Sequence, residues 1–191
     1  MNMPGAQQDS LHPSEYGPDG KPTTPLSRLL DMATAQGRLD ELATQIESTR
    51  KALPGWTAGK VPLAMVACRT GKPDVARTLV GELLDETRDD SNMLVIYWTL
   101  GVDLENDPTT RDLALTLYRR CLTNPGNDPS FVLNYQYGPS RRLVALYVRD
   151  DRREDARQFL LEASRPRDYP DYAGNEEAVA RMPVLVMLGR S

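Results

Sequence analysis

The chain has 191 residues, a formal net charge of −4 and a hydrophobic fraction of 40%. Its length fits one domain or one short repeat array, and its charge balance excludes the strongly basic composition typical of nucleic-acid-binding domains. A local basic patch stays compatible with this balance.

The first 24 residues predict a disordered or loosely packed tail, residues 1–24. Proline and glycine recur there among polar residues, at Pro4, Gly5, Pro13, Gly17, Pro18, Gly20 and Pro22. No apolar period survives in this stretch, and residues 1–10 have neither the basic start nor the apolar core of a signal peptide. The first helix is expected to begin at Thr24-Pro25, because threonine caps a helix N-terminus and proline is tolerated at the first helical position.

A short phrase recurs four times after this start: an acidic residue, one spacer, and then a small or apolar residue that opens an amphipathic run. The acidic residues are Asp40, Asp74, Asp112 and Glu154, which lie 34, 38 and 42 positions apart (74 − 40, 112 − 74, 154 − 112). A period near 34 with helical spacing inside each unit is typical of stacked helix pairs, because one pair cannot bury its apolar face alone. The sequence therefore predicts an all-α helical repeat.

Four predicted helix pairs divide residues 25–165, with an insertion loop between the third and the fourth. The pairs cover residues 25–55, 56–91, 92–123 and 139–165, and the loop covers residues 124–138. Residues 166–191 are expected to form an irregular segment followed by a C-terminal helix, in about residues 175–188. That helix is apolar on more than one face, which favours self-association or a contact with an absent part of a larger protein.

Each unit carries apolar residues at helical spacing, and glycine marks the turn between helices in the first two units. Gly37 and Gly71 are expected to adopt the left-handed conformation that ends a helix. Asp40 and Asp74 are expected in the first turn of the next helix, where the helix dipole favours a negative charge. The predicted core positions are Leu26, Leu29, Leu30, Ala33, Leu42, Ile46, Leu53, Leu63, Ala64, Ala67, Ala76, Val80, Leu83, Leu84, Tyr97, Leu100, Gly101, Leu104, Leu113, Ala114, Leu117, Tyr118, Cys121, Leu143, Val144, Tyr147, Ala156, Leu160 and Ala163.

Cysteine usage and hydropathy indicate a reducing, aqueous environment. Cys68 and Cys121 are the only cysteines, and their spacing fits neither a disulfide framework nor a zinc site, so both are expected to be reduced thiols. The longest apolar stretches, residues 93–100 and 183–188, are too short to span a bilayer. We expect a cytoplasmic protein, or the soluble part of a larger one, with no membrane contact.

These residues resemble the tetratricopeptide repeat (TPR) family over roughly residues 25–165. The first-helix pattern of that family is matched by Tyr97-x-x-Leu100-Gly101, and in part by Leu63-Ala64 and Leu143-Val144-x-x-Tyr147. The small residue of the second helix is matched by Ala76, Ala114 and Ala156, and the closing proline by Pro54. Leu42 departs from the small residue, and the tryptophan of the first helix is absent. The resemblance implies a right-handed superhelical array of antiparallel helix pairs.

The resemblance also implies a concave groove, lined by the first helix of each pair, that binds a peptide or protein segment. By their position in the repeat, the lining residues would include Asp31, Met65, Arg69, Trp98, Glu105, Arg141, Ala145 and Arg149. Trp98 has two interpretations: a groove residue that holds a peptide with an acidic end together with Arg69 and Arg141, or a core residue covered by residues 123–138. Some family members clamp a C-terminal carboxylate with lysine and asparagine; Ser27 and Asp31 stand at those positions, which argues against such a clamp.

The sequence contains no predicted active site. His12 is the only histidine and lies in the predicted tail, so neither a histidine-based triad nor a histidine metal cluster is expected, and no metal or cofactor is predicted. Adjacent acids such as Asp150-Asp151 do not face each other on a helix, so they are poor acid–base partners. The expected function is a non-catalytic scaffold for a protein or peptide partner, without nucleic-acid binding. Three alternatives stay open: an architectural piece of a larger multi-repeat protein, a hydrolase that uses carboxylates on the array, and a nucleic-acid adaptor whose arginine pairs 119–120, 141–142 and 152–153 form one stripe.

Overall fold

The computed structural model describes residues 15–16, 22–88, 90, 93–123 and 139–163. Their regular structure is helical apart from one short antiparallel pairing of β1 (Glu15–Tyr16) with β2 (Pro22–Thr23), so the all-α prediction is confirmed. The helices are α2 (Pro25–Ala35), α3 (Leu39–Ala52), α4 (Lys60–Arg69), α5 (Pro73–Glu86), α6 (Leu94–Leu104), α7 (Arg111–Thr123), α9 (Pro139–Arg149) and α10 (Arg153–Ala163), with a 3-10 turn, η1 (Thr57–Gly59), before α4. The predicted loop 124–138 and segment 166–191, with the helix expected near 175–188, lie outside the described residues.

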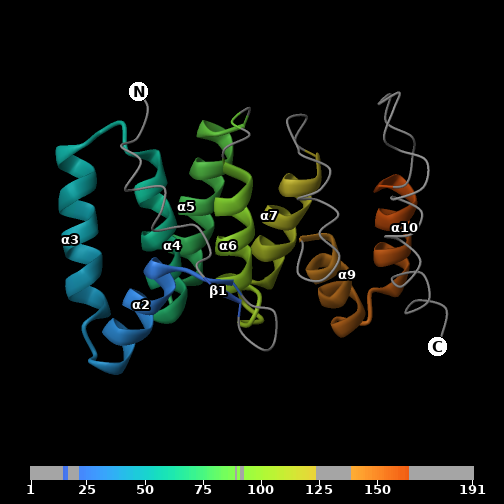
Figure 1. Cartoon of the computed structure of the whole chain (residues 1–191), viewed down its shortest axis with the longest axis horizontal. Helices are drawn as coiled ribbons and strands as arrows, with labels where there is room; N and C mark the ends of the chain where they lie inside the picture. Colours follow the sequence, from blue (N-terminus) through green and yellow to red (C-terminus); the bar gives the residue numbers. More distant parts are fainter. Residues whose placement is uncertain (1–14, 17–21, 89, 91–92, 124–138, 164–191) are drawn as a thin grey trace.

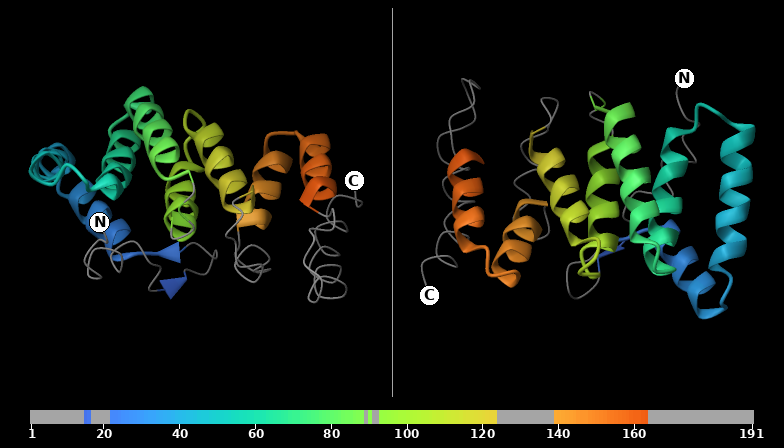
Figure 2. Two further views of the ribbon diagram at one scale, coloured as in Figure 1. Left: turned by 90° about the horizontal axis from the view of Figure 1, so that it is seen from above. Right: turned by 180° about the vertical axis from the view of Figure 1, so that it is seen from behind.

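The helices follow one another in pairs, α2–α3, α4–α5, α6–α7 and α9–α10, from one end of the molecule to the other (Figure 1). Seen from above, the chain alternates between two layers (Figure 2). We call the first helix of each pair, α2, α4, α6 and α9, an A helix, and the second, α3, α5, α7 and α10, a B helix. Neighbouring pairs meet through α3 and α4, α2 and α4, α4 and α6, and α7 and α9. The contacts between different pairs therefore join pairs that are consecutive in the chain.

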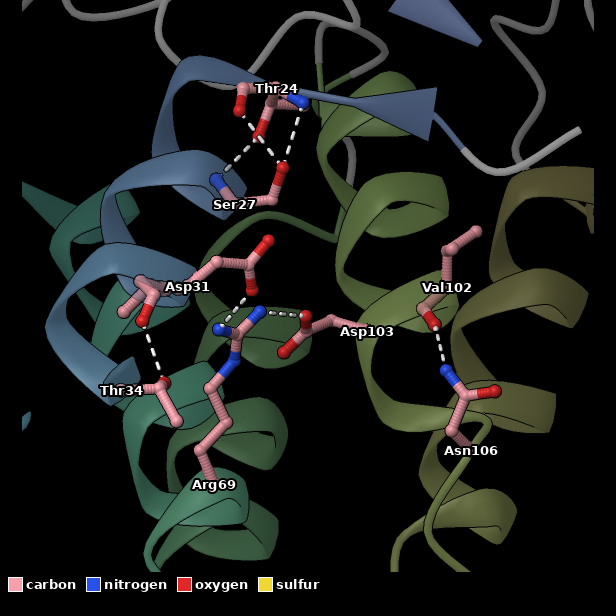
Figure 3. Close-up of polar contacts among 9 residues, drawn as sticks. Thr24, Ser27, Asp31, Thr34, Arg69, Val102, Asp103 and Asn106 are labelled. Atoms are coloured by element: carbon pink, nitrogen blue, oxygen red, sulfur yellow. Dashed lines mark hydrogen bonds and ion pairs between the residues drawn. The ribbon is translucent and has the colours of Figure 1, made fainter. Parts of the chain in front are cut away.

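The first helix begins where the sequence predicted, at a capping box. Thr24 Oγ1 accepts a hydrogen bond from the backbone N–H of Ser27 at 3.0 Å, and Ser27 Oγ accepts one from the N–H of Thr24 at 2.9 Å (Figure 3). Pro25 occupies the first helical position. The two side chains thus satisfy amide groups that the helix start leaves without carbonyl partners.

Three A helices end in the same way. Gly37, Gly71 and Asp151 follow α2, α4 and α9 with φ angles of 66°, 70° and 56°. In each case the next residue donates its N–H back to a carbonyl five residues earlier, the long hydrogen bond of a Schellman cap. These bonds join Arg38 to Ala33 at 2.8 Å, Lys72 to Ala67 at 2.8 Å and Arg152 to Tyr147 at 2.7 Å. The two glycines confirm the prediction, whereas Asp151 is a left-handed residue that was not foreseen.

The connection from α6 to α7 is built differently. Asp107 Oδ1 accepts hydrogen bonds from the backbone N–H and the hydroxyl of Thr109, both at 2.8 Å. The hydroxyl of Thr110, which is fully buried, donates to the carbonyl of Leu104 at 2.9 Å. This longer turn explains why Asp112 follows Asp74 by more than the basic period.

Every B helix begins one residue before the acidic residue of the repeated phrase, so each acid lies in the first helical turn, as was predicted for Asp40 and Asp74. The structure adds a further shared position that the sequence reasoning missed. Four residues after the acid, a hydroxyl donates to the carbonyl of that acid in three of the helices. The pairs are Thr44 with Asp40 at 2.9 Å, Thr78 with Asp74 at 3.1 Å and Thr116 with Asp112 at 2.9 Å.

Most predicted core positions whose side chains are described are buried or half-buried, but two are not. Leu29 and Leu53 are each 48% exposed. Leu53 is the residue that ends α3, beyond its packed turns, and Leu29 lies on the first A helix. Gly101 has a steric role, because a Cβ atom there would lie 2.6 Å from Cε1 of Tyr118. Glycine lets α6 and α7 approach across the Tyr118 ring.

The length and hydropathy of the described helices can be compared with what a membrane span requires. None of the helices in the described part of the chain is both long and apolar enough to cross a bilayer.

Candidate binding face on the A helices

Three residues predicted to line the groove are buried, and this part of the prediction is wrong. Met65, Trp98 and Glu105 expose 0%, 4% and 6% of their surface. Met65 lies on α4, where seven of the ten residues are buried, and Trp98 and Glu105 lie on and directly after α6, where nine of the eleven residues are buried. A residue beside the Tyr97 stripe is therefore inside the molecule as well. Trp98 is thus a core residue, whereas its predicted cover by residues 123–138 falls almost entirely outside the described residues.

Glu105, the residue that follows α6, is held by side chains from two other helices. The hydroxyl of Tyr118 donates to Glu105 Oε2 at 2.7 Å, and Arg142 Nε donates to the same oxygen at 3.1 Å. A second guanidinium nitrogen of Arg142 pairs with Glu105 Oε1. Burial, followed by the charge of Glu105, raises the pKa of Tyr118 well above its ordinary value, so the phenol keeps its proton. The buried ion pair between Arg142 and Glu105 therefore connects α9 to the C-terminal end of α6.

A second cluster joins three consecutive A helices through one guanidinium (Figure 3). Arg69 at the end of α4 donates to Asp31 Oδ1 of α2 and to Asp103 Oδ1 of α6, both at 2.7 Å. The Arg69 and Asp103 side chains are only 18% and 15% exposed, whereas that of Asp31 is 70% exposed. Burial raises the pKa of Asp103, although Arg69 opposes this effect. Asp31 and Arg69 were among the predicted groove residues, whereas Asp103 was not.

The predicted groove residues of α9 form one stripe on the helix surface. Arg141, Ala145 and Arg149 are spaced by four residues, which places them on the same side of the helix, and all three are exposed. Arg149 Nη2 donates to the backbone carbonyl of Glu105 at 2.6 Å. A cation at this carbonyl is favourable, because the C-terminal end of α6 carries the negative end of the helix dipole.

Arg69 and Arg149 therefore reach the last turn of α6 from its two neighbouring A helices. Both precede a left-handed residue by two positions, Gly71 and Asp151, so they occupy equivalent places in their helices. This convergence of α4 and α9 on the end of α6 was not predictable from either helix alone.

The paired arginines of the sequence have separate contacts in the structure. Arg120 donates to the backbone carbonyl of Arg88 at 2.6 Å. Two guanidinium groups lie over the Tyr147 ring, with Arg119 at 5.6 Å and Arg152 at 4.9 Å from its centroid. These arginines therefore make contacts within the protein.

Chemistry at the thiols is suppressed by burial. Cys68 and Cys121 are free thiols, and burial raises the pKa of Cys68 to about 11 and that of Cys121 further. Within the described residues, no group of histidine, cysteine, aspartate or glutamate side chains could hold a metal ion.

The accessible part of the predicted groove consists of five side chains on the A helices. We call it the A-helix face, formed by Asp31, Arg69, Arg141, Ala145 and Arg149. Comparisons of the chain with protein-family models, with curated protein sequences and with solved structures found no match. The geometry of this face is therefore the basis for assigning a function to the chain.

Proposed function

We propose that the chain is a non-catalytic interaction scaffold that binds a peptide or protein segment along the A-helix face. In this proposal the helix pairs form a TPR-like, right-handed superhelical array. The shared Schellman caps and the equal placement of the acidic residues support a common plan for the pairs. A soluble protein with a protein partner, and not a nucleic acid or a membrane, is part of the same proposal.

The observation that carries the proposal is the convergence of Arg69 and Arg149 on the end of α6. Each guanidinium is oriented by a partner within the protein, Asp103 for Arg69 and the Glu105 carbonyl for Arg149. Side chains that are already ordered lose less conformational entropy when a ligand binds. Asp31 and Ala145 flank them as exposed residues, so a partner can approach across several helices at once.

A photo-reactive side chain in place of Ala145 tests this proposal. Ala145 is exposed and lies between Arg141 and Arg149, so a bound segment would pass within reach. The matched control places the same group at Thr116, which is exposed on the B helix α7. We expect a discrete cross-linked partner, identified by mass spectrometry, from position 145 and not from position 116. Equal cross-linking from both positions would contradict the proposal.

Charge reversal on the same stripe gives a second readout with the purified partner. Arg141→Glu together with Arg149→Glu should weaken binding roughly tenfold or more, since desolvated charged contacts contribute about 1.5–3 kcal/mol each. Arg157→Glu on the exposed surface of α10 is the control. Unchanged affinity in the double variant would show that the partner binds elsewhere.

An architectural role without a ligand is the second candidate, and one observation favours it. Arg69 and Arg142 are each paired with carboxylates of neighbouring helices, so both act as ties between pairs. On this alternative the cross-linking experiment yields no partner. The hydrolase alternative needs two facing carboxyl groups, whereas Asp103 and Glu105 each face an arginine.

A further inference from the structure

We propose that the protein segment bound on the A-helix face is acidic where it crosses α9, and that a carboxylate side chain of this segment pairs with Arg149. This inference rests on the proposed scaffold function and specifies the charge of the partner. It follows from how unevenly the arginines around the end of α6 are neutralised within the protein. Arg69 is paired with two carboxylates, whereas Arg149 is paired with none among the described residues.

Four arginines contact residues 103–105 at the C-terminal end of α6. They come from α4, α7 and α9, and three of them have a carboxylate partner. The pairs are Arg69 with Asp31 and Asp103, Arg111 with Asp150, and Arg142 with Glu105. The side chains of these three arginines are 18%, 19% and 13% exposed, so they face the interior of the protein more than a ligand.

The fourth arginine, Arg149, is exposed and has a different contact. Its Nη2 donates to the backbone carbonyl of Glu105 at 2.6 Å, which also accepts from Arg111 Nε at 3.4 Å. A carbonyl oxygen has only a partial charge, so it orients the guanidinium without neutralising it. A guanidinium has five N–H donors and binds a carboxylate through two parallel hydrogen bonds. Arg149 is therefore an ordered cation with donors left for an anionic ligand.

The neighbours of Arg149 on α9 favour such a ligand. Ala145 lies one turn before it on the same side, and its small side chain lets a bound segment approach the helix closely. Arg141 lies one turn further back and adds a second positive charge to this side. Asp150, the next residue in the chain, is held by Arg111 at 2.6 Å and does not pair with Arg149. The α9 part of the A-helix face thus contains two cations and no acid.

The α2 part of the A-helix face has the opposite charge. The Asp31 side chain is 70% exposed, whereas its partner Arg69 is 18% exposed and also binds Asp103 (Figure 3). Helices α4 and α6 separate α2 from α9 along the array, so the two charges lie well apart (Figure 1). Like charges that face each other in an interface are unfavourable. A complementary segment is therefore acidic over α9 and not over α2.

This polarity also favours a protein segment over a nucleic acid. A nucleic acid carries a negative charge at every nucleotide, so the part that crossed α2 would face the Asp31 carboxylate. A protein segment can change from acidic to neutral within a few residues. The change in charge along the face thus selects a protein partner.

Peptide probes of about twelve residues, which span roughly 40 Å when extended, test this inference by NMR titration of the arginine side chains. In the half-acidic probes, glutamates fill either the first or the second half, and serine and glycine fill the rest. One control probe has glutamine in place of glutamate, and another has glutamate throughout. The termini are acetylated and amidated, so that only side chains carry charge. In the ¹⁵N-labelled full chain, the Nε–H signal of Arg149 is assigned by its loss in Arg149→Gln.

We expect one half-acidic probe to shift the Arg149 signal saturably and the glutamine probe to leave it unchanged. Arg149→Gln should weaken binding of that half-acidic probe roughly fivefold or more, because it removes a charged contact. Arg153→Gln is the matched control, since it removes the same charge from an exposed arginine of the B helix α10. Equal weakening by the two variants, or an Arg149 signal that does not shift up to millimolar probe, would overturn the inference.

The uniformly acidic probe tests the polarity of the face. It should bind the wild type more weakly than the half-acidic probe despite its larger charge, because part of it faces Asp31. Asp31→Asn should remove this difference. A uniformly acidic probe that binds the wild type more tightly than the half-acidic probe would contradict the polarity.

Results with the natural partner distinguish the acidic preference from the scaffold function itself. A partner captured at position 145 whose cross-linked segment lacks acidic residues would overturn the acidic preference and leave the scaffold function intact. Failure to capture any partner, with the half-acidic probe still bound at Arg149, would overturn the scaffold function and leave the carboxylate preference of Arg149 intact.

Discussion

The first and the third helix pairs have similar elements but different surroundings. Helices α2 and α3 have 11 and 14 residues, and α6 and α7 have 11 and 13. Yet α6 buries nine residues, whereas α2 buries three and α3 buries only Leu39. Among the described residues, the third pair has a neighbouring pair on both sides, and the first has one on a single side. The local sequence thus determines where each helix begins and ends, whereas the position of the helix in the array determines how many of its residues are buried.

The ion pairs between neighbouring helix pairs show the same difference in burial. Between the third and fourth pairs, Glu105 and Arg142 are 8% and 13% exposed. Between the first and second pairs, the side chains of Lys72 and Asp40 are 56% and 84% exposed, and Lys72 Nζ lies 3.4 Å from Asp40 Oδ1. A buried charge that loses its partner cannot be solvated, whereas an exposed one can. Perturbations at the centre of the array should therefore have larger effects than equivalent perturbations at its first pair.

Arg142→Met should show the largest effect. It leaves Glu105 buried without its guanidinium, which should destabilise the protein by about 3–5 kcal/mol in urea unfolding. Lys72→Met, the matched change at the exposed pair, should leave the midpoint nearly unchanged. Adding Glu105→Gln to Arg142→Met should restore part of the loss. Equal effects of the two single variants would refute the proposed difference between the two junctions.

Gly101→Ala should have the next largest effect. The added methyl group would meet the ring of Tyr118, which is fully buried and cannot move aside, so we expect a loss of about 1–3 kcal/mol. Gly81→Ala is the control within α5, where nothing lies within 4 Å. It should stabilise the protein by roughly 0.5–1 kcal/mol, because alanine is the better helix former. Thermal melts that order these variants the other way would exclude the close α6–α7 approach.

The shared caps predict opposite results for two reciprocal changes. Asp151→Gly should raise the free energy of unfolding by about 1 kcal/mol, since glycine adopts a left-handed conformation without the steric penalty of a Cβ atom. Gly71→Ala should lower it by a similar amount. Chemical denaturation of both variants measures the difference. A destabilised Asp151→Gly would show that the aspartate makes a contribution beyond the turn.

Thiol labelling requires no substitution, so it perturbs the fold least. The labelling rates of Cys68, Cys121 and the unfolded chain should differ clearly. With a pKa of about 11, Cys68 is mostly protonated at pH 8, so its reaction should be roughly a hundredfold slower than in the unfolded chain. Its rate should rise as the pH approaches that value, because only the thiolate reacts. Cys121, which is fully buried, should react more slowly still. Faster labelling of Cys121 would indicate that the third pair opens before the second.

Features governed by local contacts were predictable from the sequence. Thr24-Pro25, Gly37 and Gly71 act within one turn, so their roles follow from capping and left-handed geometry alone. Asp151 could have been found as well. It precedes Glu154 by three residues, as the two glycines precede Asp40 and Asp74.

Which residues line an exposed groove depends on contacts between helices that are far apart in the sequence, so the pattern within one segment cannot predict it. Whether Met65, Trp98 and Glu105 face solvent depends on how neighbouring pairs cover their helices, and a period in the sequence does not specify this. Asp103 was missed for the same reason, because its partner Arg69 lies 34 residues away on another helix. Burial of α6 on almost every side had a sequence signal, because residues 94–102 contain no charged residue and only one small polar residue, Thr99.

Distances between spin labels on the B helices test the arrangement of the array most directly. Thr44, Thr78, Thr116 and Gln158 each lie four residues after the acidic residue of their helix, and all are exposed. Cysteine labels at these positions, in a background with Cys68→Ser and Cys121→Ala, report pulsed electron–electron distances along the molecule. Pairs of helices stacked on their neighbours predict distances from position 44 that increase steadily to positions 78, 116 and 158. A distance from 44 to 158 as short as that from 44 to 78 would show helices grouped around one centre and would contradict the account.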